Sequence, residues 1–164
     1  MATSRRRAPP IRIRRATVKD LDVLVHQRRQ MWRDISGSST EDLDPADAAY
    51  RRWARQRMQS GRLVAFVAET KAREVVAGGA VWVREIQPRP GAALRRQPYL
   101  LSMYTEPAFR GKGLATKIVK TAIAWAKARG FPSMTLHASD LGRGVYEKLG
   151  FRMTTEMRLR FARR

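Results

Sequence analysis

The stretch FRGKGLA at residues 109–115 alternates two basic side chains with two glycines, directly before an apolar pattern of helical spacing. The glycines at 111 and 113 permit positive φ angles, so backbone amides there can approach a ligand closely. A helix that begins near Leu114 points its first N–H groups and the positive end of its dipole back into this turn. The stretch therefore predicts an anion site, and a diphosphate suits its geometry and charge. An ordinary glycine turn before a helix is the alternative.

Two familiar phosphate-binding loops do not match this stretch. A P-loop requires Ser or Thr directly after its Gly-Lys pair, and this chain has Gly113 there. A dinucleotide-binding fingerprint would have a small residue in place of Thr116 and an acidic residue about twenty positions later. The loop is therefore of another kind.

The segments before the loop predict a strand, two helices and three strands. Residues 11–17 alternate apolar and polar side chains, as a half-exposed strand does. Thr17 and Asp20 have the spacing of a capping box, which predicts a helix through Ile35. Asp44-Pro45 is typical of an N-cap followed by proline, which predicts a second helix from there to Gly61. Three β-rich segments follow, separated by a short turn and a proline-rich loop at 87–98, at residues 62–69, 75–86 and 99–106.

The segments after the loop predict a helix, a strand, a second helix and a last strand. One apolar face runs from Leu114 to a stop at Gly130. Residues 133–139 form a short strand, Ser139 or Asp140 caps the next helix, and residues 151–161 are the last strand. Such mixing of elements predicts an α/β sheet covered by helices.

Composition limits the classes of protein that this chain can represent. Its 164 residues, 43% of them apolar, suffice for one domain, which we place at 11–164 after a basic, flexible tail at 1–10. Without cysteine the chain has no disulfide or thiolate metal site, and two histidines make a metal site unexpected. No run of about 18 apolar residues exists, so we expect no membrane span, no secretion signal and a cytoplasmic location. The net charge of +20 is spread along the chain, which favours a solvated basic surface and leaves a nucleic-acid partner open.

A second motif, SDLGRGVYEKLGFR at residues 139–152, places Tyr146 on a helix that ends in Leu-Gly-Phe. Together with the loop at 110–115, this motif resembles the GCN5-related N-acetyltransferase (GNAT) family, over roughly residues 11–161. The resemblance implies a mixed, mostly antiparallel sheet of about six to seven strands flanked by about four helices.

The resemblance also implies that the bound diphosphate belongs to acetyl-CoA, the acyl donor. In the family, the amides of the loop hold the diphosphate, and the strand before the loop parts from its neighbour and binds the pantetheine arm through its backbone. The residues expected to bind the cofactor are Leu101, Met103, Tyr104, Thr105, Arg110, Gly111, Lys112, Gly113, Leu114, Ala115, Thr116 and Ser139.

For catalysis, the resemblance assigns Tyr146 as the acid that protonates the leaving thiolate, with a packed helix tyrosine as the alternative. The amide of Met103 or Tyr104 is expected to stabilise the oxyanion. Glu106 is the candidate general base, acting through water, although a solvated carboxylate at a strand end also explains it. His137 is a weaker candidate for the base, and we expect His26 to be exposed and without a role.

The acceptor site is expected over the first two predicted helices. Glu41, Asp42, Asp44 and Asp47 gather within seven residues, and such a patch would attract a cationic amine. The alternative is that Asp44 caps a helix and that its neighbours interact with the dipole. Trp32, Asp42 and Asp44 are the predicted acceptor residues, and the loop at 87–98 is expected to close over the acceptor.

The sequence therefore predicts an N-acetyltransferase that moves an acetyl group from acetyl-CoA directly to a primary amine of a small molecule or peptide. A catalytically silent acyl-CoA-binding or RNA-associated basic module is the alternative. No metal is required, and a homodimer is left open.

Overall fold

The computed structural model of the protein describes residues 10–161 except 89 and 92–94. Its strands are β1 (Arg12–Arg15), β2 (Leu63–Glu69), β3 (Val75–Glu85), β4 (Arg96–Thr105) and β5 (Thr135–Leu136). Its α-helices are α1 (Leu21–Ser36), α2 (Thr40–Gln59), α3 (Leu114–Ala128) and α4 (Asp140–Lys148). The strands form one sheet in the order β1-β2-β3-β4-β5, antiparallel from β1 to β4 and parallel between β4 and β5. The α/β class, the mixed sheet and the four helices are confirmed, and the described strands number five rather than six or seven.

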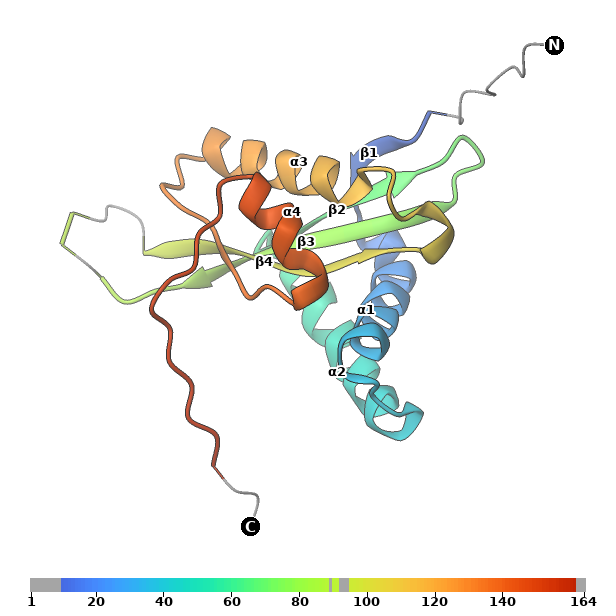
Figure 1. The fold of residues 1–164 in the computed structure, drawn as a ribbon, viewed down its shortest axis with the longest axis horizontal. Coiled ribbons are helices and arrows are strands. Elements are labelled where there is room, and N and C mark those ends of the chain that lie inside the picture. Colours follow the sequence, from blue (N-terminus) through green and yellow to red (C-terminus); the bar gives the residue numbers. More distant parts are fainter. Residues whose placement is uncertain (1–9, 89, 92–94, 162–164) are drawn as a thin grey trace.

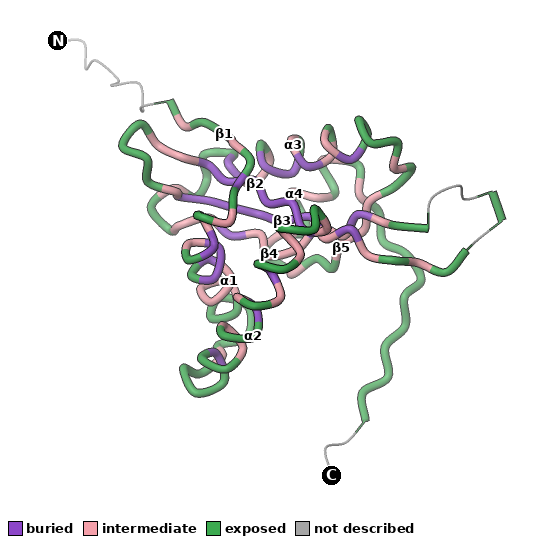
Figure 2. Tube along the Cα trace, turned by 180° about the vertical axis from the view of Figure 1, so that it is seen from behind, coloured by how far each residue is buried: buried purple, intermediate pink, exposed green. Residues whose placement is uncertain are grey.

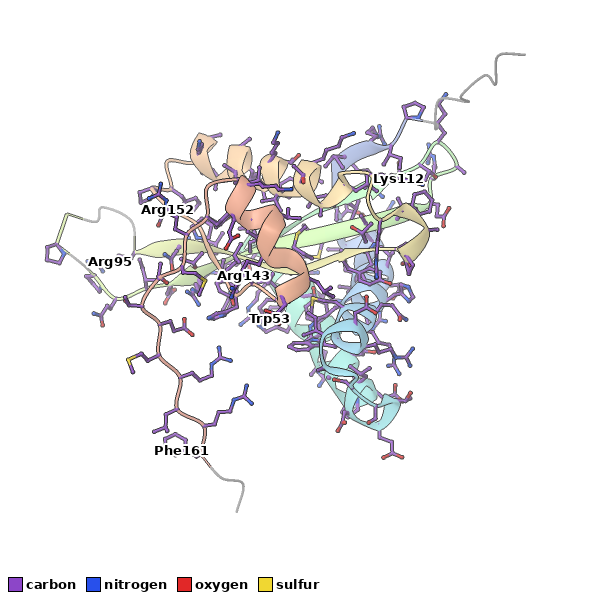
Figure 3. The ribbon with its side chains drawn as sticks, viewed as in Figure 1. Trp53, Arg95, Lys112, Arg143, Arg152 and Phe161 are labelled. Carbon is purple, nitrogen blue, oxygen red and sulfur yellow. The ribbon has the colours of Figure 1, made fainter. Side chains whose placement is uncertain are left out.

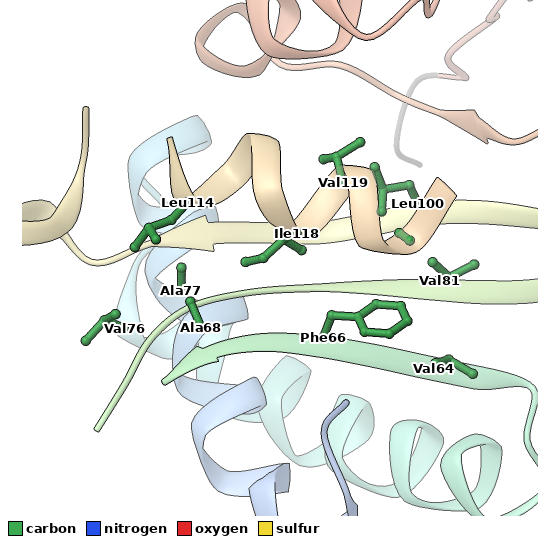
Figure 4. Close-up of a cluster of buried hydrophobic side chains, with 11 residues drawn as sticks. Val64, Phe66, Ala68, Val76, Ala77, Val81, Leu100, Leu114, Ile118 and Val119 are labelled. Carbon is green, nitrogen blue, oxygen red and sulfur yellow. The ribbon is translucent and has the colours of Figure 1, made fainter. Parts of the chain in front are cut away.

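The helices cover both faces of the sheet, with α1 and α2 on one face and α3 on the other (Figure 1). Alternate residues of β2 therefore enter two different cores. Leu63, Ala65 and Val67 pack with α1 and α2, whereas Val64, Phe66 and Ala68 pack under α3 (Figure 4). Burial on both faces explains why β2 is a continuous apolar run (Figure 2).

The start of α1 is fixed by the predicted capping box. Thr17 accepts a hydrogen bond from the Lys19 amide at 3.3 Å, and Asp20 accepts one from the Thr17 amide at 2.7 Å. Arg14 on β1 donates to both carboxylate oxygens of Asp20, at 2.7 and 3.0 Å, and to Glu69 on β2 at 2.6 Å. This network joins β1, β2 and the entry to α1.

The network predicts a loss of stability in acid. Hydrogen bonds from Arg14 hold the pKa of Asp20 below its usual value of 3.8. A carboxyl group with a depressed folded-state pKa stabilises the fold above its unfolded-state pKa, and this stability is lost as the pH falls through the folded-state value. Asn also caps helices, so Asp20→Asn isolates the charge. We expect it to lower the free energy of unfolding by about 1 kcal/mol at pH 6, and by nothing measurable near pH 2.

Urea titrations from pH 6 to pH 2 measure this difference. Asp22→Asn is the control, because that carboxylate lies two residues further along and its side chain is exposed. A penalty for Asp20→Asn that stayed constant down to pH 2 would contradict the assignment.

Two element boundaries differ from the sequence predictions. Helix α2 begins at Thr40, because Ser39 is its N-cap and accepts from the Asp42 amide at 3.2 Å. Pro45 therefore lies inside α2, where it costs one intrahelical hydrogen bond, and Asp44 caps nothing. Strand β4 begins at Arg96 rather than at residue 99, because the end of β3 extends its pairing as far as Glu85 opposite Arg96. Of the loop at 87–98, residues 89 and 92–94 lie outside the described part.

The prediction of a last strand at 151–161 is wrong for this chain, and β5 is limited to two residues. Residues 151–161 form no strand and run away from the body of the protein (Figure 1). A strand needs a neighbour for its backbone hydrogen bonds, and the described residues supply none beyond β5. The tail prediction for residues 1–10 falls, apart from Pro10, outside the described residues. No helix of the described part is long and apolar enough to cross a membrane.

Candidate active site

The site begins at a β-bulge in the middle of β4. Gly78 pairs with Tyr104 and Ala80 with Leu101, so two residues, Ser102 and Met103, lie opposite Gly79. Ser102 has φ +55°, which is uncommon for a residue other than glycine. A side chain at position 79 would overlap the Met103 sulfur, so this position needs glycine. Such bulges re-aim side chains and end pairing beside functional sites.

Past the middle of β4, the strand parts from β5. The two strands pair only at Tyr99 with Thr135 and at Leu100 with Leu136. On that side, residues 101–105 have no strand neighbour within the described part of the chain. The predicted parting of the strand before the loop is therefore confirmed, whereas its role in binding a pantetheine arm stays a prediction.

A cavity of about 280 Å³ lies beside the parted end of β4. It is bounded by α1, β4, the 109–113 loop, the start of α3 and α4. Seven of its lining residues were predicted for the site: Met103, Tyr104, Thr105, Arg110, Ala115, Ser139 and Tyr146. Six others were missed: Met31, Asp34, Ile35, Leu141, Gly142 and Val145. The remaining predicted residues lie outside this lining: Leu101, Glu106, Gly111, Lys112, Gly113, Leu114, Thr116, Trp32, Asp42 and Asp44.

The loop before α3 has the predicted geometry of an anion site. Gly111 and Gly113 have φ of +72° and +74°, and Gly113 is the N-cap of α3 without any capping side chain. Within the described part of the chain, the N–H groups of residues 111–116 donate to no acceptor. Buried or ligand-facing N–H groups of this kind are normally satisfied by caps, water or ligands. The start of α3 is thus suited to a bound anion.

The two basic side chains of the loop are held by protein atoms. Arg110 donates to Asp34 on α1 at 2.6 Å and to the Thr105 carbonyl at 2.9 Å. Lys112, which Figure 3 labels on this loop, donates to the Ala108 carbonyl at 3.0 Å. Arg110 therefore fastens the loop to α1. Its partner Asp34, 76 positions away in sequence, could not be found from local patterns.

Tyr104 lies between these groups, on the face of β4 that packs against α1. Its hydroxyl lies near Asp34, Glu106 and Arg110, and its ring carries the Arg110 guanidinium 5.5 Å from its centre. Burial, followed by the charges of Glu106 and Asp34, raises the pKa of Tyr104 above its usual value of 10.0. Tyr104 is thus a neutral hydrogen-bonding group at physiological pH.

Tyr146 projects from α4 into the cavity, opposite β4. Ser139 caps α4 by accepting from the Gly142 amide at 3.3 Å, which decides between the two predicted caps. The Tyr146 ring meets Phe151 edge-on with 5.9 Å between centres. Burial raises the pKa of Tyr146 above 10.0, so its hydroxyl keeps its proton across the physiological range. That is the state a proton donor needs.

The structure pairs Glu106 with His26. The Glu106 carboxylate lies 3.2 Å from His26 Nε2 on α1, although the two are 80 residues apart. His26 is exposed as predicted, but the expectation that it has no role is wrong, because it holds the candidate base. His137 lies outside the cavity lining; it binds the Tyr99 hydroxyl through Nδ1 and Glu156 through Nε2 at 2.8 Å.

The acidic segment at the start of α2 is not an open anionic patch. Arg29 on α1 donates to Asp44 at 2.7 Å and to Asp47 at 2.6 Å, and so compensates both charges. Asp42 accepts from the Ser39 hydroxyl at 2.9 Å in the helix cap. Asp34 is therefore the carboxylate that lines the cavity, whereas the acceptor role of Trp32, Asp42 and Asp44 stays a prediction. Among the described residues, no three His, Asp or Glu side chains are grouped to hold a metal ion.

A parted mixed sheet with an uncapped helix N-terminus beside a buried tyrosine is the arrangement expected of an acyl-CoA-dependent transferase. Residues 26–151 match the Acetyltransferase (GNAT) family, well over half of the chain. This chain therefore belongs to the GNAT family.

Three proteins illustrate the similarity. A crystal structure of a GCN5-related N-acetyltransferase from Ralstonia eutropha is 25% identical, with a TM-score of 0.85, and covers 93% of this chain and 99% of that one. A predicted acetyltransferase from Clostridium acetobutylicum, solved with acetyl-CoA, is 31% identical, with a TM-score of 0.83 and coverage of 93% and 96%. An uncharacterized N-acetyltransferase from Methanocaldococcus jannaschii is 30% identical over 107 residues. That match covers 62% of this chain and 43% of the relative, so the chain spans less than half of the relative's length.

Proposed function

We propose that this chain transfers an acetyl group from acetyl-CoA directly to a primary amine of a small molecule or peptide. The observation that carries the proposal is one cavity lined by the phosphate-type loop, through Arg110 and Ala115, and by Tyr146 on its other side. The proposal gains support from the family and from the relative that was solved with acetyl-CoA.

The residues present fit the donor. Amides from Gly111 to Thr116 lack acceptors within the described chain and suit the two phosphates of a diphosphate. The backbone of residues 101–105 lacks a strand neighbour on the cavity side and suits an extended, amide-containing arm. Bound there, the donor supplies an acetyl thioester, and no metal is required.

Three groups of this chain serve the transfer. Tyr146, protonated because burial raises its pKa, donates a hydrogen bond to the departing sulfur. The amide of Met103 or Tyr104, at the bulge, stabilises charge on the carbonyl oxygen. Glu106, held by His26, accepts the proton of the attacking ammonium through water. An alkyl ammonium has a pKa of about 10.4, so the amine must lose a proton at pH 7 before it can attack.

A screen of amines tests the function. Wild-type protein with acetyl-CoA is offered polyamines, aminoglycosides, amino acids and short peptides, while thiol release is followed. We expect saturable turnover with at least one primary amine, and acetyl-CoA binding by calorimetry without any acceptor. RNA binding that falls steeply with added salt, combined with no heat from acetyl-CoA, would replace this proposal with the nucleic-acid alternative.

Removing the proposed base should matter less as the pH rises. Glu106→Gln leaves a neutral amide beside His26, so we expect kcat/KM for the amine to fall about 10- to 100-fold at pH 7. Near pH 10 the amine is largely neutral without help, and the variant should approach the wild type. His26→Gln is the comparison, since it removes the partner and keeps the carboxylate. A defect for Glu106→Gln that is equal at pH 7 and pH 10 would exclude the base role.

A further inference from the structure

Residues 151–161 have the pattern of a half-buried strand, although the structure leaves them unpaired. Every odd position except Thr155 is apolar, and every even position is polar or charged. Such strict alternation is typical of a strand with one face in a core. Met153, Met157, Leu159 and Phe161 are nevertheless 75–95% exposed. Figure 3 shows Phe161 far from the body of the protein, at the end of this segment.

The edge of the sheet beside this segment is open, and the core beneath it is incomplete. β5 is the last strand of the sheet among the described residues. The apolar side chains around it, Met134, Leu136, Leu149 and Phe151, pack against the α3 core but stay partly exposed. The indole N–H of Trp125 on α3 is buried without a partner in the described chain. An added strand would cover this edge and bury apolar side chains on both sides of the contact.

The segment is poorly suited to fold back onto its own edge. Glu156 is bound to His137, one residue past β5, at 2.8 Å. From Glu156 onward, the apolar residues could reach their own β5 only if the chain reversed direction. Residues 152–161 contain no Gly, Pro, Asn or Asp, the residues on which tight turns depend. A second copy offers the same open edge without requiring a turn.

We propose that two copies of this chain exchange residues 157–161, each adding a strand to the β5 edge of the other. The exchange is a two-fold, self-complementary contact, because every copy carries one donor strand and one open edge. Met157, Leu159 and Phe161 of one copy cover the apolar side chains around β5 of its partner. The charged face of the strand, with Arg158 and Arg160, stays toward solvent.

The exchange also bears on the proposed active site. Helix α4 carries Tyr146, yet none of its residues is buried. The exchanged strand follows directly from Phe151, whose ring meets Tyr146. Anchoring the strand in a partner would therefore hold α4 and its tyrosine against β4, and a monomer would keep the cavity but hold Tyr146 less firmly.

The first test changes the apolar face of the segment. Met157→Asp with Leu159→Asp should convert a dimer of two 18.7 kDa chains into a monomer, measured by light scattering after gel filtration. Arg158→Gln with Arg160→Gln lowers the net charge by the same two charges on the opposite face and should stay dimeric. Added salt should tighten the wild-type dimer, because it screens repulsion between two chains of charge +20. A wild type that is monomeric at 50 μM, or a dimer that survives the aspartates, would overturn the proposal.

A cross-linking experiment decides the question even if the aspartate variant fails to fold. The chain has no cysteine, so Thr135→Cys on one copy and Leu159→Cys on another are unique sites. After co-expression, a short bis-maleimide should join them into a band of two chains. With both cysteines on one chain mixed with cysteine-free protein, the exchange predicts no link within a monomer. Such an internal link would show that the strand docks on its own sheet, which refutes the exchange while leaving the acetyltransferase proposal untouched.

Discussion

Gly113→Val is expected to weaken acetyl-CoA binding at least 100-fold while leaving the fold intact. Gly113 has φ +74°, a conformation that a β-branched residue rarely adopts, so valine must shift the turn or bear strain. No atom lies within 4 Å of the added Cβ, so the change does not overpack the core. Its effect falls on the amides of residues 111–116. A loss of about 2.8 kcal/mol, at 1.4 kcal/mol per factor of ten, gives the expected 100-fold.

The other end of α3 supplies a matched control for this change. Gly130 also has φ +74°, also has no atom within 4 Å of a built Cβ, and follows the helix C-terminus. Gly130→Val therefore imposes the same backbone strain where no cofactor group is proposed. Isothermal calorimetry with acetyl-CoA and thermal melting should show equal losses of stability for both variants, but lost affinity for Gly113→Val alone. Equal affinities in the two variants would refute the loop assignment.

The parts of the fold that the sequence predicted well are those decided locally or by two-sided burial. The Thr17 capping box, the α3 face from Leu114 and the continuous apolar run of β2 each carry their own signal, and the structure confirms all three. The start of α2 was wrong because Ser39 and Asp44 both have cap chemistry, and their order along the chain does not say which one caps. Residues 151–161 carry a strand pattern, but the partner that would complete the strand is not among the described residues.

The site divides in the same way. The glycine loop and Tyr146 belong to contiguous motifs, so their residues could be named in advance, and the structure brings Arg110, Ala115 and Tyr146 to one cavity. The contacts of Asp34 with Arg110 and of His26 with Glu106 join residues that are 76 and 80 positions apart. The bulge at Ser102 depends on the register between β3 and β4. None of these follows from spacing, because each arises only when α1 and β3 pack against β4.

Tyr146→Phe is expected to lower kcat about 100-fold and to change acetyl-CoA affinity by less than about threefold. The substitution removes one hydroxyl and keeps the ring that packs against Phe151 and Gly142. Removal of a positioned proton donor typically costs a factor of 10²–10⁴. Because the group acts on the departing sulfur rather than on the bound diphosphate, the loss should appear in turnover and not in binding.

The pH profile gives this prediction a second readout. Tyr146 works as a donor while protonated, and burial raises its pKa above 10.0, so its activity is present below that raised pKa and lost as the pH rises through it. Wild-type kcat should therefore show no decline from this group below about pH 10, and Tyr146→Phe should lie below it by a constant factor over that range. Tyr99→Phe removes a hydroxyl that binds His137 outside the cavity, and its kcat should stay within about threefold of wild type. Wild-type turnover in Tyr146→Phe would assign the tyrosine to packing alone and leave the thiolate to be protonated by water.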